Sequence, residues 1–505
     1  MNRNKPASIV MIQGTGSSVG KSLIVTGLCR LLAQDGYRVA PFKAQNMSLN
    51  SAVTPDGLEI GRAQAVQAEA AGVEPEVEMN PVLLKPEGNR TSQLVAMGKM
   101  RGKLQAMDFL TRKMRLWTVV TDALDTLRQR YDVVVVEGAG SPAEINLRSG
   151  DIVNMAVALH ADAPVFLVGD IDKGGVFASL YGTVELISEQ ERELVKGFII
   201  NKFRGDVELL KPGLGMIEDL TSVPVAGVLP YLTDVYVPEE DSPRMARVSD
   251  QAIGGQTLDI AIIALPHMAN FDEFDPLARR DGVRLRYVRH ASEFGRPDLV
   301  IIPGSKTTVA DLDAMRRSGL EESVRRHLGD ERPLVGVCGG MQMLGSSIHD
   351  PEGVESDQPL VEGLDILDID THFMGDKLTT RTHGTIVGNT GLLAGASELP
   401  FAGYEIHVGV SDSRGRAIPV MELDNGGPPI GFANSNGRVL GTYVHDLFKN
   451  DAVVDRILSN VASMRGLAGQ YGTDEFSQDE EYDKLASYLR KYLDIGLMYR
   501  EMGLG

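Results

Sequence analysis

The sequence predicts an α/β protein of two domains, because two separate series of short apolar runs alternate with helical or loop segments. Runs of the first series lie at residues 9–13, 37–42, 133–136, 163–169, 196–200 and 223–229. Runs of the second series lie at residues 258–265, 283–288, 298–302 and 334–337, and shorter ones follow at 404–408 and 439–444. Alternation of this kind is typical of parallel sheets that helices cover on both faces. We therefore expect a doubly wound parallel sheet in the N-terminal half and a second α/β domain in the C-terminal half.

A change of composition marks the boundary between the two series. Residues 236–257 are rich in Pro, Glu, Asp and Ser and contain a Gly-Gly pair, which is typical of a linker. We expect an N-terminal domain over residues 1–235 and a C-terminal domain over 258–450. Residues 451–505 are polar and mostly helical by pattern, and we expect a helical tail without chemistry of its own.

The composition indicates an enzyme of the cytoplasm and excludes several kinds of partner. A chain of 505 residues is too long to fold around a single hydrophobic core. The net charge of −19 argues against nucleic acid and against an anionic membrane surface, because both need clustered Lys and Arg. No apolar run is long enough to span a bilayer, and the N-terminus lacks the apolar core of a signal peptide. The only cysteines, Cys29 and Cys338, exclude a disulfide framework. We expect small-molecule substrates, and the oligomeric state stays open.

A glycine-rich loop that ends in Gly-Lys-Ser follows the first predicted strand. Its expected phosphate-binding residues are Gly14, Thr15, Gly16, Gly20, Lys21 and Ser22. Backbone N–H groups of such a loop point at one anion, and the dipole of the following helix adds to the attraction. The lysine would reach the β- and γ-phosphates of ATP, and the serine hydroxyl would bind Mg²⁺. The spacing from the first glycine, Gly-x₅-Gly-Lys-Ser, is one residue longer than in the common P-loop and resembles the loop of dethiobiotin synthetases.

Polar residues follow other strands of the first series, where a doubly wound sheet binds its ligands. Lys43 follows the second run, Glu137 the third and Asn201 the fifth. Any one of them is an ordinary residue for a strand end, but their common place at one sheet edge indicates a ligand site. We expect Glu137 to hold Mg²⁺ directly or through water. We expect Lys43 in the ATP site and Asn201 at the adenine edge.

A second glycine-rich turn presents a cysteine. Cys338 stands between Gly336 and Gly340 at the end of a predicted strand, in the Gly-x-nucleophile-x-Gly form of a nucleophile elbow. The N–H of Gly339 would lie at a helix N-terminus, where it lowers the pKa of the thiol and helps to hold an oxyanion. Gly304, just after the run at 298–302, is the expected source of a second oxyanion N–H.

A cysteine nucleophile of this kind needs a base. His445 ends the run at 439–444 and is the expected base. His407, which also lies at or near a strand end, is the alternative.

Together these motifs resemble the class I, or triad-type, glutamine amidotransferases, and within that class the cobyric acid synthase branch. The matching stretches lie at residues 43–48, 80–86, 137–146, 303–306, 336–345, 403–407 and 441–445. One departure from the class matters, because the triad usually ends in His-x-Glu and here Asp446 and Leu447 follow the histidine. Cobyric acid synthases and cobyrinic diamide synthases also lack this glutamate. Which residue orients His445 therefore stays open.

The resemblance implies a reaction and its cofactors. It implies amidation of the b, d, e and g carboxylates of adenosylcobyrinic acid a,c-diamide, a corrinoid substrate, to give adenosylcobyric acid. ATP with Mg²⁺ would activate each carboxylate as an acyl phosphate. Glutamine would supply ammonia through a thioester on Cys338. From the arrangement of two sites in one chain, rather than from the resemblance, we expect a dry passage between the domains that keeps this ammonia unprotonated.

Other functions also fit parts of the sequence. A cobyrinic acid a,c-diamide synthase would perform the same chemistry on other carboxylates. A regulatory or partition ATPase of the deviant P-loop type would carry a second lysine early in the loop, where this chain has Thr15 and Gly16, and would not need the cysteine elbow. A glutaminase subunit alone would leave the N-terminal domain unexplained.

Overall fold

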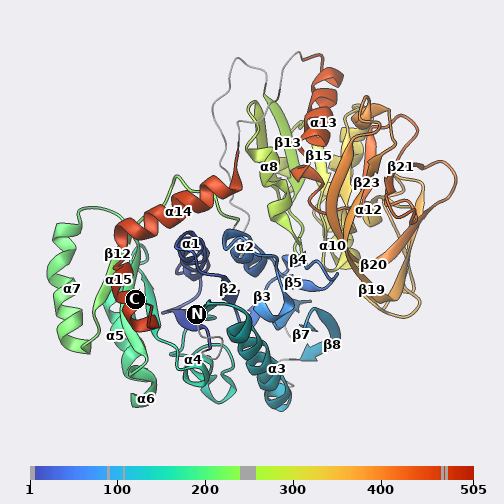
Figure 1. Cartoon of the computed structure of the whole chain (residues 1–505). Helices are drawn as coiled ribbons and strands as arrows, with labels where there is room; N and C mark the ends of the chain where they lie inside the picture. Colours follow the sequence, from blue (N-terminus) through green and yellow to red (C-terminus); the bar gives the residue numbers. More distant parts are fainter. Residues whose placement is uncertain are drawn as a thin grey trace. The chain divides into compact units, whose positions relative to one another are not determined.

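The computed structural model describes residues 6–87, 91–105, 109–238, 257–467, 471 and 476–504. The chain divides into two compact units (Figure 1). Unit 1 comprises Met1–Ser48, Leu58–Asp241 and Ser477–Gly505, and unit 2 comprises Leu49–Gly57 and Ser242–Phe476. Most of the predicted linker, residues 239–256, lies outside the described residues.

This division differs from the predicted one in two places. A short segment of the N-terminal half, Leu49–Gly57, belongs to unit 2. The predicted tail is also not one element, because its first helix, α13 (Asp451–Met464), lies in unit 2 and its last two helices lie in unit 1.

The main sheet of unit 1 is parallel throughout its described strands. Its order is β12-β11-β10-β1-β9-β2. The strands are β1 (Ser8–Gly14), β2 (Val39–Phe42), β9 (Val133–Glu137), β10 (Val165–Asp170), β11 (Val195–Phe203) and β12 (Val225–Pro230). Each predicted run of the first series falls on one of these strands, and the doubly wound α/β class is confirmed.

Helices surround this sheet. They include α1 (Lys21–Gln34), α2 (Arg62–Ala70), α3 (Phe109–Arg130), α4 (Met155–Ala161), α5 (Val176–Leu186) and α7 (Val207–Thr221). A second, smaller sheet has the order β3-β6-β7-β8, with strands Gln45–Met47, Val82–Pro86, Thr91–Ala96 and Lys99–Gln105. This sheet was not predicted from the sequence. No helix in the described ranges is both long and apolar enough to cross a membrane.

The C-terminal helices α14 (Gln478–Tyr492) and α15 (Ile495–Met502) complete the core of unit 1. In Figure 1, α14 runs beside α1, the helix that follows the phosphate loop. The side chain of Leu489 reaches α1 at Gly27, where an added Cβ would lie 2.5 Å from the leucine Cδ1. Arg30 on α1 pairs with Asp483 on α14 at 2.6 Å. Apolar burial therefore ties the end of the chain to the nucleotide-binding half.

Unit 2 is built on a mixed sheet. Its parallel part has the order β14-β13-β15-β16-β23. These strands are Val283–Val288, Leu258–Ile263, Leu299–Ile302, Leu334–Val337 and Val439–Thr442, and each carries a predicted run of the second series. The sheet continues through β22 (Gly431–Ala433), β21 (Ile418–Leu423), β19 (Ile369–Ile386), β17 (Ser347–His349) and β18 (Leu360–Glu362).

The prediction of a short strand at residues 404–408 was wrong in length. The strand there is β20 (Pro400–Ser413), and it pairs antiparallel with the longer strand β19. Many residues of both strands are exposed, so polar side chains interrupt the apolar pattern that marks a buried strand.

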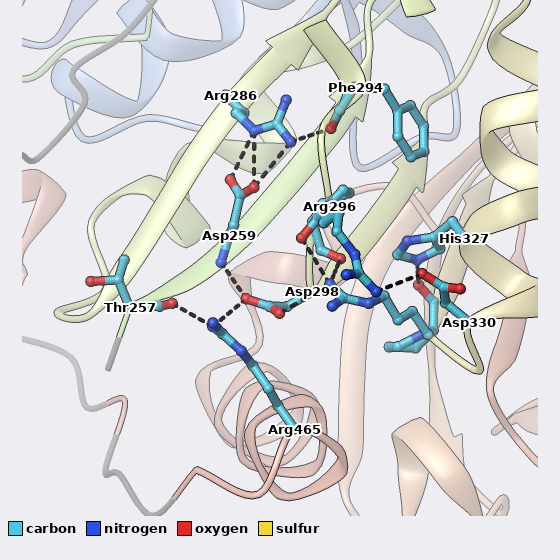
Figure 2. Close-up of polar contacts among 12 residues, drawn as sticks. Thr257, Asp259, Arg286, Phe294, Arg296, Asp298, His327, Asp330 and Arg465 are labelled. Atoms are coloured by element: carbon cyan, nitrogen blue, oxygen red, sulfur yellow. Dashed lines mark hydrogen bonds and ion pairs between the residues drawn. The ribbon is translucent and has the colours of Figure 1, made fainter. Parts of the chain in front are cut away.

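A polar cluster at the amino ends of the parallel strands fixes α13 to unit 2 (Figure 2). The carboxylate of Asp298, just before β15, accepts a hydrogen bond from the backbone N–H of Asp259 at 2.8 Å. Arg465, just after α13, donates to the same carboxylate at 2.8 Å and to the carbonyl of Thr257 at 2.9 Å. The cluster is therefore structural, because it lies at the sheet edge opposite to the one that ends in Cys338.

Candidate active sites

The strand register of unit 1 brings the predicted ligand residues to one edge of the sheet. Glu137 on β9 is paired with Ile12 on β1, two residues before the phosphate loop. Asn201 on β11 is paired with Asp170, the last residue of β10. Because parallel strands point the same way, their carboxyl ends form a single edge.

The phosphate loop connects the end of β1 to the start of α1. Gly20 adopts a positive φ of 101°, and a Cβ there would lie 2.1 Å from Nδ2 of Asn201, so this position favours glycine. Lys21 folds back over the loop, where its Nζ donates to the carbonyl of Gly16 at 2.9 Å and to that of Gly140 at 3.3 Å. The loop backbone and one ammonium group therefore surround the place predicted for phosphates.

Glu137 lies at the centre of a buried network. Its Oε1 accepts hydrogen bonds from Ser22 Oγ at 2.8 Å and is 2.9 Å from Lys43 Nζ, and its Oε2 accepts from Gln67 Nε2 at 2.6 Å. Burial alone would raise the pKa of Glu137, but the ammonium of Lys43 and these hydrogen bonds lower it. The side chain is therefore held as a carboxylate.

These donors fit a magnesium ion. The hydroxyl of Ser22 and the carboxylate of Glu137 are hard oxygen ligands beside a phosphate loop. Among the described residues, no group of three or more His, Cys, Asp or Glu side chains is arranged to hold a metal. Mg²⁺ at this place would depend on these two oxygens together with phosphate oxygens and water, which is its usual environment beside nucleotides.

The amide of Asn201 is engaged with the phosphate loop. Its Nδ2 donates to the carbonyl of Val19 at 2.8 Å, and its Oδ1 accepts from the backbone N–H of Lys202 at 2.9 Å. The role predicted for Asn201 at the adenine edge stays a prediction.

In unit 2, Cys338 occupies a sharp turn between β16 and α12 (Gly339–Leu344). Its φ of 50° and ψ of −110° are unusual for a side chain with a Cβ, which is typical of a strained functional turn. At Gly340 a Cβ would lie 2.0 Å from the carbonyl oxygen of Ile302, so α12 approaches β15 more closely than another residue would allow. The thiol contacts the carbonyl oxygen of Ile406 at 3.7 Å.

His445 lies beside Cys338 although 107 positions separate the two in the sequence. It follows β23, the strand next to β16, and its ring is within hydrogen-bonding reach of the cysteine thiol. Its Nδ1 is 3.2 Å from Oε1 of Glu273, and both side chains are buried. Burial would lower the pKa of His445, but the carboxylate of Glu273, followed by the charge of Cys338, raises it well above the ordinary value.

The alternative base, His407, has other partners. Its Nδ1 is 2.7 Å from the carbonyl oxygen of Gly409, and its Nε2 is 3.0 Å from Oε2 of Glu405. Its ring stacks on Tyr443 with centroids 3.8 Å apart. Since both ring nitrogens of His407 are engaged, the geometry favours His445 as the partner of the thiol.

The two glycines predicted as oxyanion donors lie close to the cysteine. A Cβ at Gly304 would be 3.7 Å from the Cβ of Cys338 and 3.0 Å from Cε1 of His445. Gly339 is the first residue of α12, where backbone N–H groups lack helical acceptors. The oxyanion role of both N–H groups stays a prediction.

Three residues that contact these sites were not among the predicted ones. Gln67 on α2 holds Glu137, Glu273 holds His445, and Tyr404 stacks on His445 with ring centroids 5.2 Å apart. Gln67 and Glu273 are far from their partners along the chain, so spacing carries no signal for them. Tyr404 lies in the matching stretch 403–407, where the analysis singled out only the histidine.

Models of two protein families match the chain. Residues 10–243 match the CobQ/CobB/MinD/ParA nucleotide-binding domain, and residues 259–453 match the CobB/CobQ-like glutamine amidotransferase domain. The first match covers the phosphate loop and the network around Glu137. The second covers the cysteine elbow, Glu273 and His445.

Full-length relatives match along nearly the whole chain. A cobyric acid synthase of Yersinia enterocolitica is 48% identical over 502 residues, which is 98% of each chain. One of Dehalococcoides mccartyi is 45% identical over 503 residues and 99% of each chain. One of Moorella thermoacetica is 45% identical over 509 residues, which is 99% of this chain and 98% of the relative.

Proposed function

The chain belongs to the cobyric acid synthase family, and on this premise we propose that it amidates the b, d, e and g carboxylates of adenosylcobyrinic acid a,c-diamide to give adenosylcobyric acid. It is a glutamine-dependent amidotransferase of cobalamin biosynthesis, and the choice of corrinoid carboxylates is the proposal. The observation that carries it is the identity of nearly half of all residues over almost the full length of both chains. The proposal includes a cytoplasmic location.

We assign release of ammonia to unit 2. The thiolate of Cys338 attacks the side-chain amide carbon of glutamine, and the N–H groups of Gly304 and Gly339 stabilise the oxyanion that forms. His445 gives its proton to the departing nitrogen, so ammonia leaves and a thioester of glutamate remains on the sulfur. Water then attacks the thioester, which releases glutamate and restores the thiol. The close contact of Cys338 with His445 supports this assignment.

We assign activation of the corrinoid carboxylate to unit 1. A carboxylate is a poor acceptor for ammonia, so it first attacks the γ-phosphorus of ATP, which gives an acyl phosphate and ADP. Ammonia then attacks the acyl carbon and phosphate leaves, which forms the amide. The ammonium of Lys21 and the N–H groups of the loop from Gly14 to Gly20 would hold the phosphates.

Mg²⁺ fits this site through Ser22 and Glu137, and its charge would offset that of the phosphates. In the described structure Lys43 neutralises Glu137 at 2.9 Å. This pairing matters because an unpaired buried carboxylate is costly.

The test is turnover of the purified chain with adenosylcobyrinic acid a,c-diamide, ATP and glutamine, followed by mass spectrometry. We expect four successive amidations. Each replaces a hydroxyl by an amino group and consumes one ATP. No change in mass of the a,c-diamide, with amidation of cobyrinic acid itself, would identify a cobyrinic acid a,c-diamide synthase instead.

A further inference from the structure

The histidine beside Cys338 has a buried carboxylate partner that does not come from its own strand. We propose that Glu273 is the positioning residue of His445 and takes the place of the acid that the sequence lacks after this histidine. Nδ1 of His445 is 3.2 Å from Oε1 of Glu273, and the backbone N–H of Asp446 donates to Oε2 at 3.3 Å. The side chains of His445 and Glu273 are 2% and 1% exposed. The inference builds on the proposed role of His445 in glutamine hydrolysis.

The contacts around His445 leave one ring nitrogen for the thiol. Nδ1 faces Glu273, so Nε2 is the nitrogen that can accept the proton of Cys338. Tyr404 covers one face of the ring, with an angle of 18° between the ring planes. The backbones of Tyr404 and His445 also bond to each other, at 2.9 and 3.3 Å. A carboxylate at Nδ1 fixes the tautomer and the orientation of such a ring, as the acid of a Ser-His-Asp triad does.

The acid that follows His445 in the sequence, Asp446, pairs with a lysine. Asp446 directs its carboxylate to Nζ of Lys449 at 2.9 Å, within the short helix η6 (Leu447–Lys449). Its backbone N–H donates to Oε2 of Glu273, and its charge acts on Glu273 from a greater distance. The charge next to Nδ1 is therefore that of Glu273.

Glu273 is itself held in place by its surroundings. It lies on the short helix η4 (Phe271–Phe274), which begins after Asn270. The backbone N–H of Asn270 donates to Oδ1 of Asn50 at 2.7 Å, and Oδ1 of Asn270 accepts from the backbone N–H of Ser51 at 2.8 Å. Phe274 packs on Phe448 of η6, with ring centroids 5.7 Å apart. Hydrogen bonds and aromatic packing on both sides of Glu273 thus fix its distance to His445.

Burial raises the pKa of Glu273, while the charge and hydrogen bond of His445 lower it, so the carboxylate is ionised together with the protonated histidine. The charge of Glu273 then favours the ion pair that the reaction needs. When Cys338 gives its proton to His445, the imidazolium lies between the thiolate and the Glu273 carboxylate. Asp272 on η4 and Asp446 beside the histidine add negative charge, which Lys449 partly neutralises. The hydroxyl of Tyr443 also lies in the field of Cys338. Loss of the Glu273 charge should therefore disfavour transfer of the Cys338 proton to His445.

The test compares Glu273→Gln with a matched control, Asp446→Asn. Each removes one carboxylate near His445 and changes few atoms, and Asn tolerates the positive φ of 61° at position 446. The first readout is the rate of alkylation of Cys338 by iodoacetamide as a function of pH. It needs no substrate, and Cys29 is fully buried and does not compete. The second is amidation with glutamine and, separately, with ammonium chloride.

For Glu273→Gln we expect the midpoint of alkylation to rise by about 1 to 3 pH units. Glutamine-dependent turnover should fall about 10- to 100-fold. Ammonia-dependent turnover should stay at the wild-type level, which also shows that the variant is folded. Glu273→Asp keeps the charge, so its alkylation midpoint should return toward that of the wild type. Asp446→Asn should shift the alkylation midpoint less than Glu273→Gln does, because the Asp446 carboxylate pairs with Lys449.

An unchanged alkylation midpoint in Glu273→Gln, with glutamine-dependent turnover within twofold of the wild type, would overturn the role of Glu273. An equal shift in Asp446→Asn would also overturn it, because the effect would then be one of general charge. Failure of the wild type to amidate with either nitrogen donor would instead refute the proposed function, and the alkylation result for Glu273 would still stand.

Discussion

The C-terminal helices make a strong prediction about the nucleotide-binding unit, which Leu489→Ala tests. Leu489 on α14 is 1% exposed, and its Cδ1 lies against Gly27 on α1. Because glycine has no side chain at that point, the surroundings cannot easily fill the space that the leucine leaves. A fully buried Leu→Ala change costs about 2–5 kcal/mol, from lost transfer free energy and the cavity that remains.

The expected effect is local to unit 1. A loss of about 2–5 kcal/mol raises the equilibrium constant for opening of α1 roughly 30-fold to several thousandfold, since about 1.4 kcal/mol corresponds to a factor of ten. Hydrogen exchange measured by mass spectrometry on peptides from α1 should show this directly. ATP-dependent amidation should weaken in parallel, because α1 begins at the phosphate loop.

Leu458→Ala is the matched control. Leu458 is also fully buried and also lies in the C-terminal 55 residues of the sequence, but it belongs to α13 in unit 2. Leu458→Ala should increase hydrogen exchange in unit 2 and leave the amides of α1 protected. If Leu489→Ala leaves the exchange of α1 unchanged, or if both variants affect the same unit, the assignment of the end of the chain to unit 1 is wrong.

Two further predictions concern the phosphate loop and the acid sensitivity of unit 2. Lys21→Ala should abolish amidation with glutamine and with ammonia alike, because it acts on the ATP step; turnover with ammonia in this variant would refute the role of the loop. Burial lowers the pKa of His327 to about 4, and its Nε2 contacts the carbonyl oxygen of Pro333 at 2.8 Å (Figure 2 shows its place near Asp298). As the pH falls, His327 of the unfolded chain therefore takes up a proton at about pH 6.5, before His327 of the folded chain does. The free energy of unfolding decreases between about pH 6.5 and 4, by about 3 kcal/mol. In urea unfolding at pH 7 and pH 4.5, His327→Gln should lose less stability on acidification than the wild type; an equal loss in both would contradict this assignment.

Much of the fold could be predicted because buried parallel strands leave a clear pattern. Continuous apolar runs such as residues 133–136 and 334–337 have no exposed face, so they stand out from the amphipathic segments between them. The glycines of the phosphate loop and of the turn at Cys338 were an equally clear signal. Close backbone approach and positive φ angles favour glycine over residues with a Cβ. These features placed the phosphate loop and Cys338 correctly at the carboxyl ends of β1 and β16.

What could not be predicted depends on contacts between distant segments. The strands β19 and β20 are partly exposed, so their sequences lack a continuous apolar run. The polar tail divides between the units because its buried leucines have different partners, which periodicity does not reveal. Glu273 precedes His445 by 172 positions, and only the fold brings the two together.

The central claim is that one chain releases ammonia at Cys338 and uses it at a separate ATP-dependent site, and Cys338→Ser tests this most directly. The variant should be purified and assayed with adenosylcobyrinic acid a,c-diamide and ATP, with glutamine or with ammonium chloride as the nitrogen donor. We predict no amidation with glutamine and wild-type amidation with ammonium. Loss of both activities in a folded variant would mean that Cys338 is structural, and full activity with glutamine would place the nucleophile elsewhere.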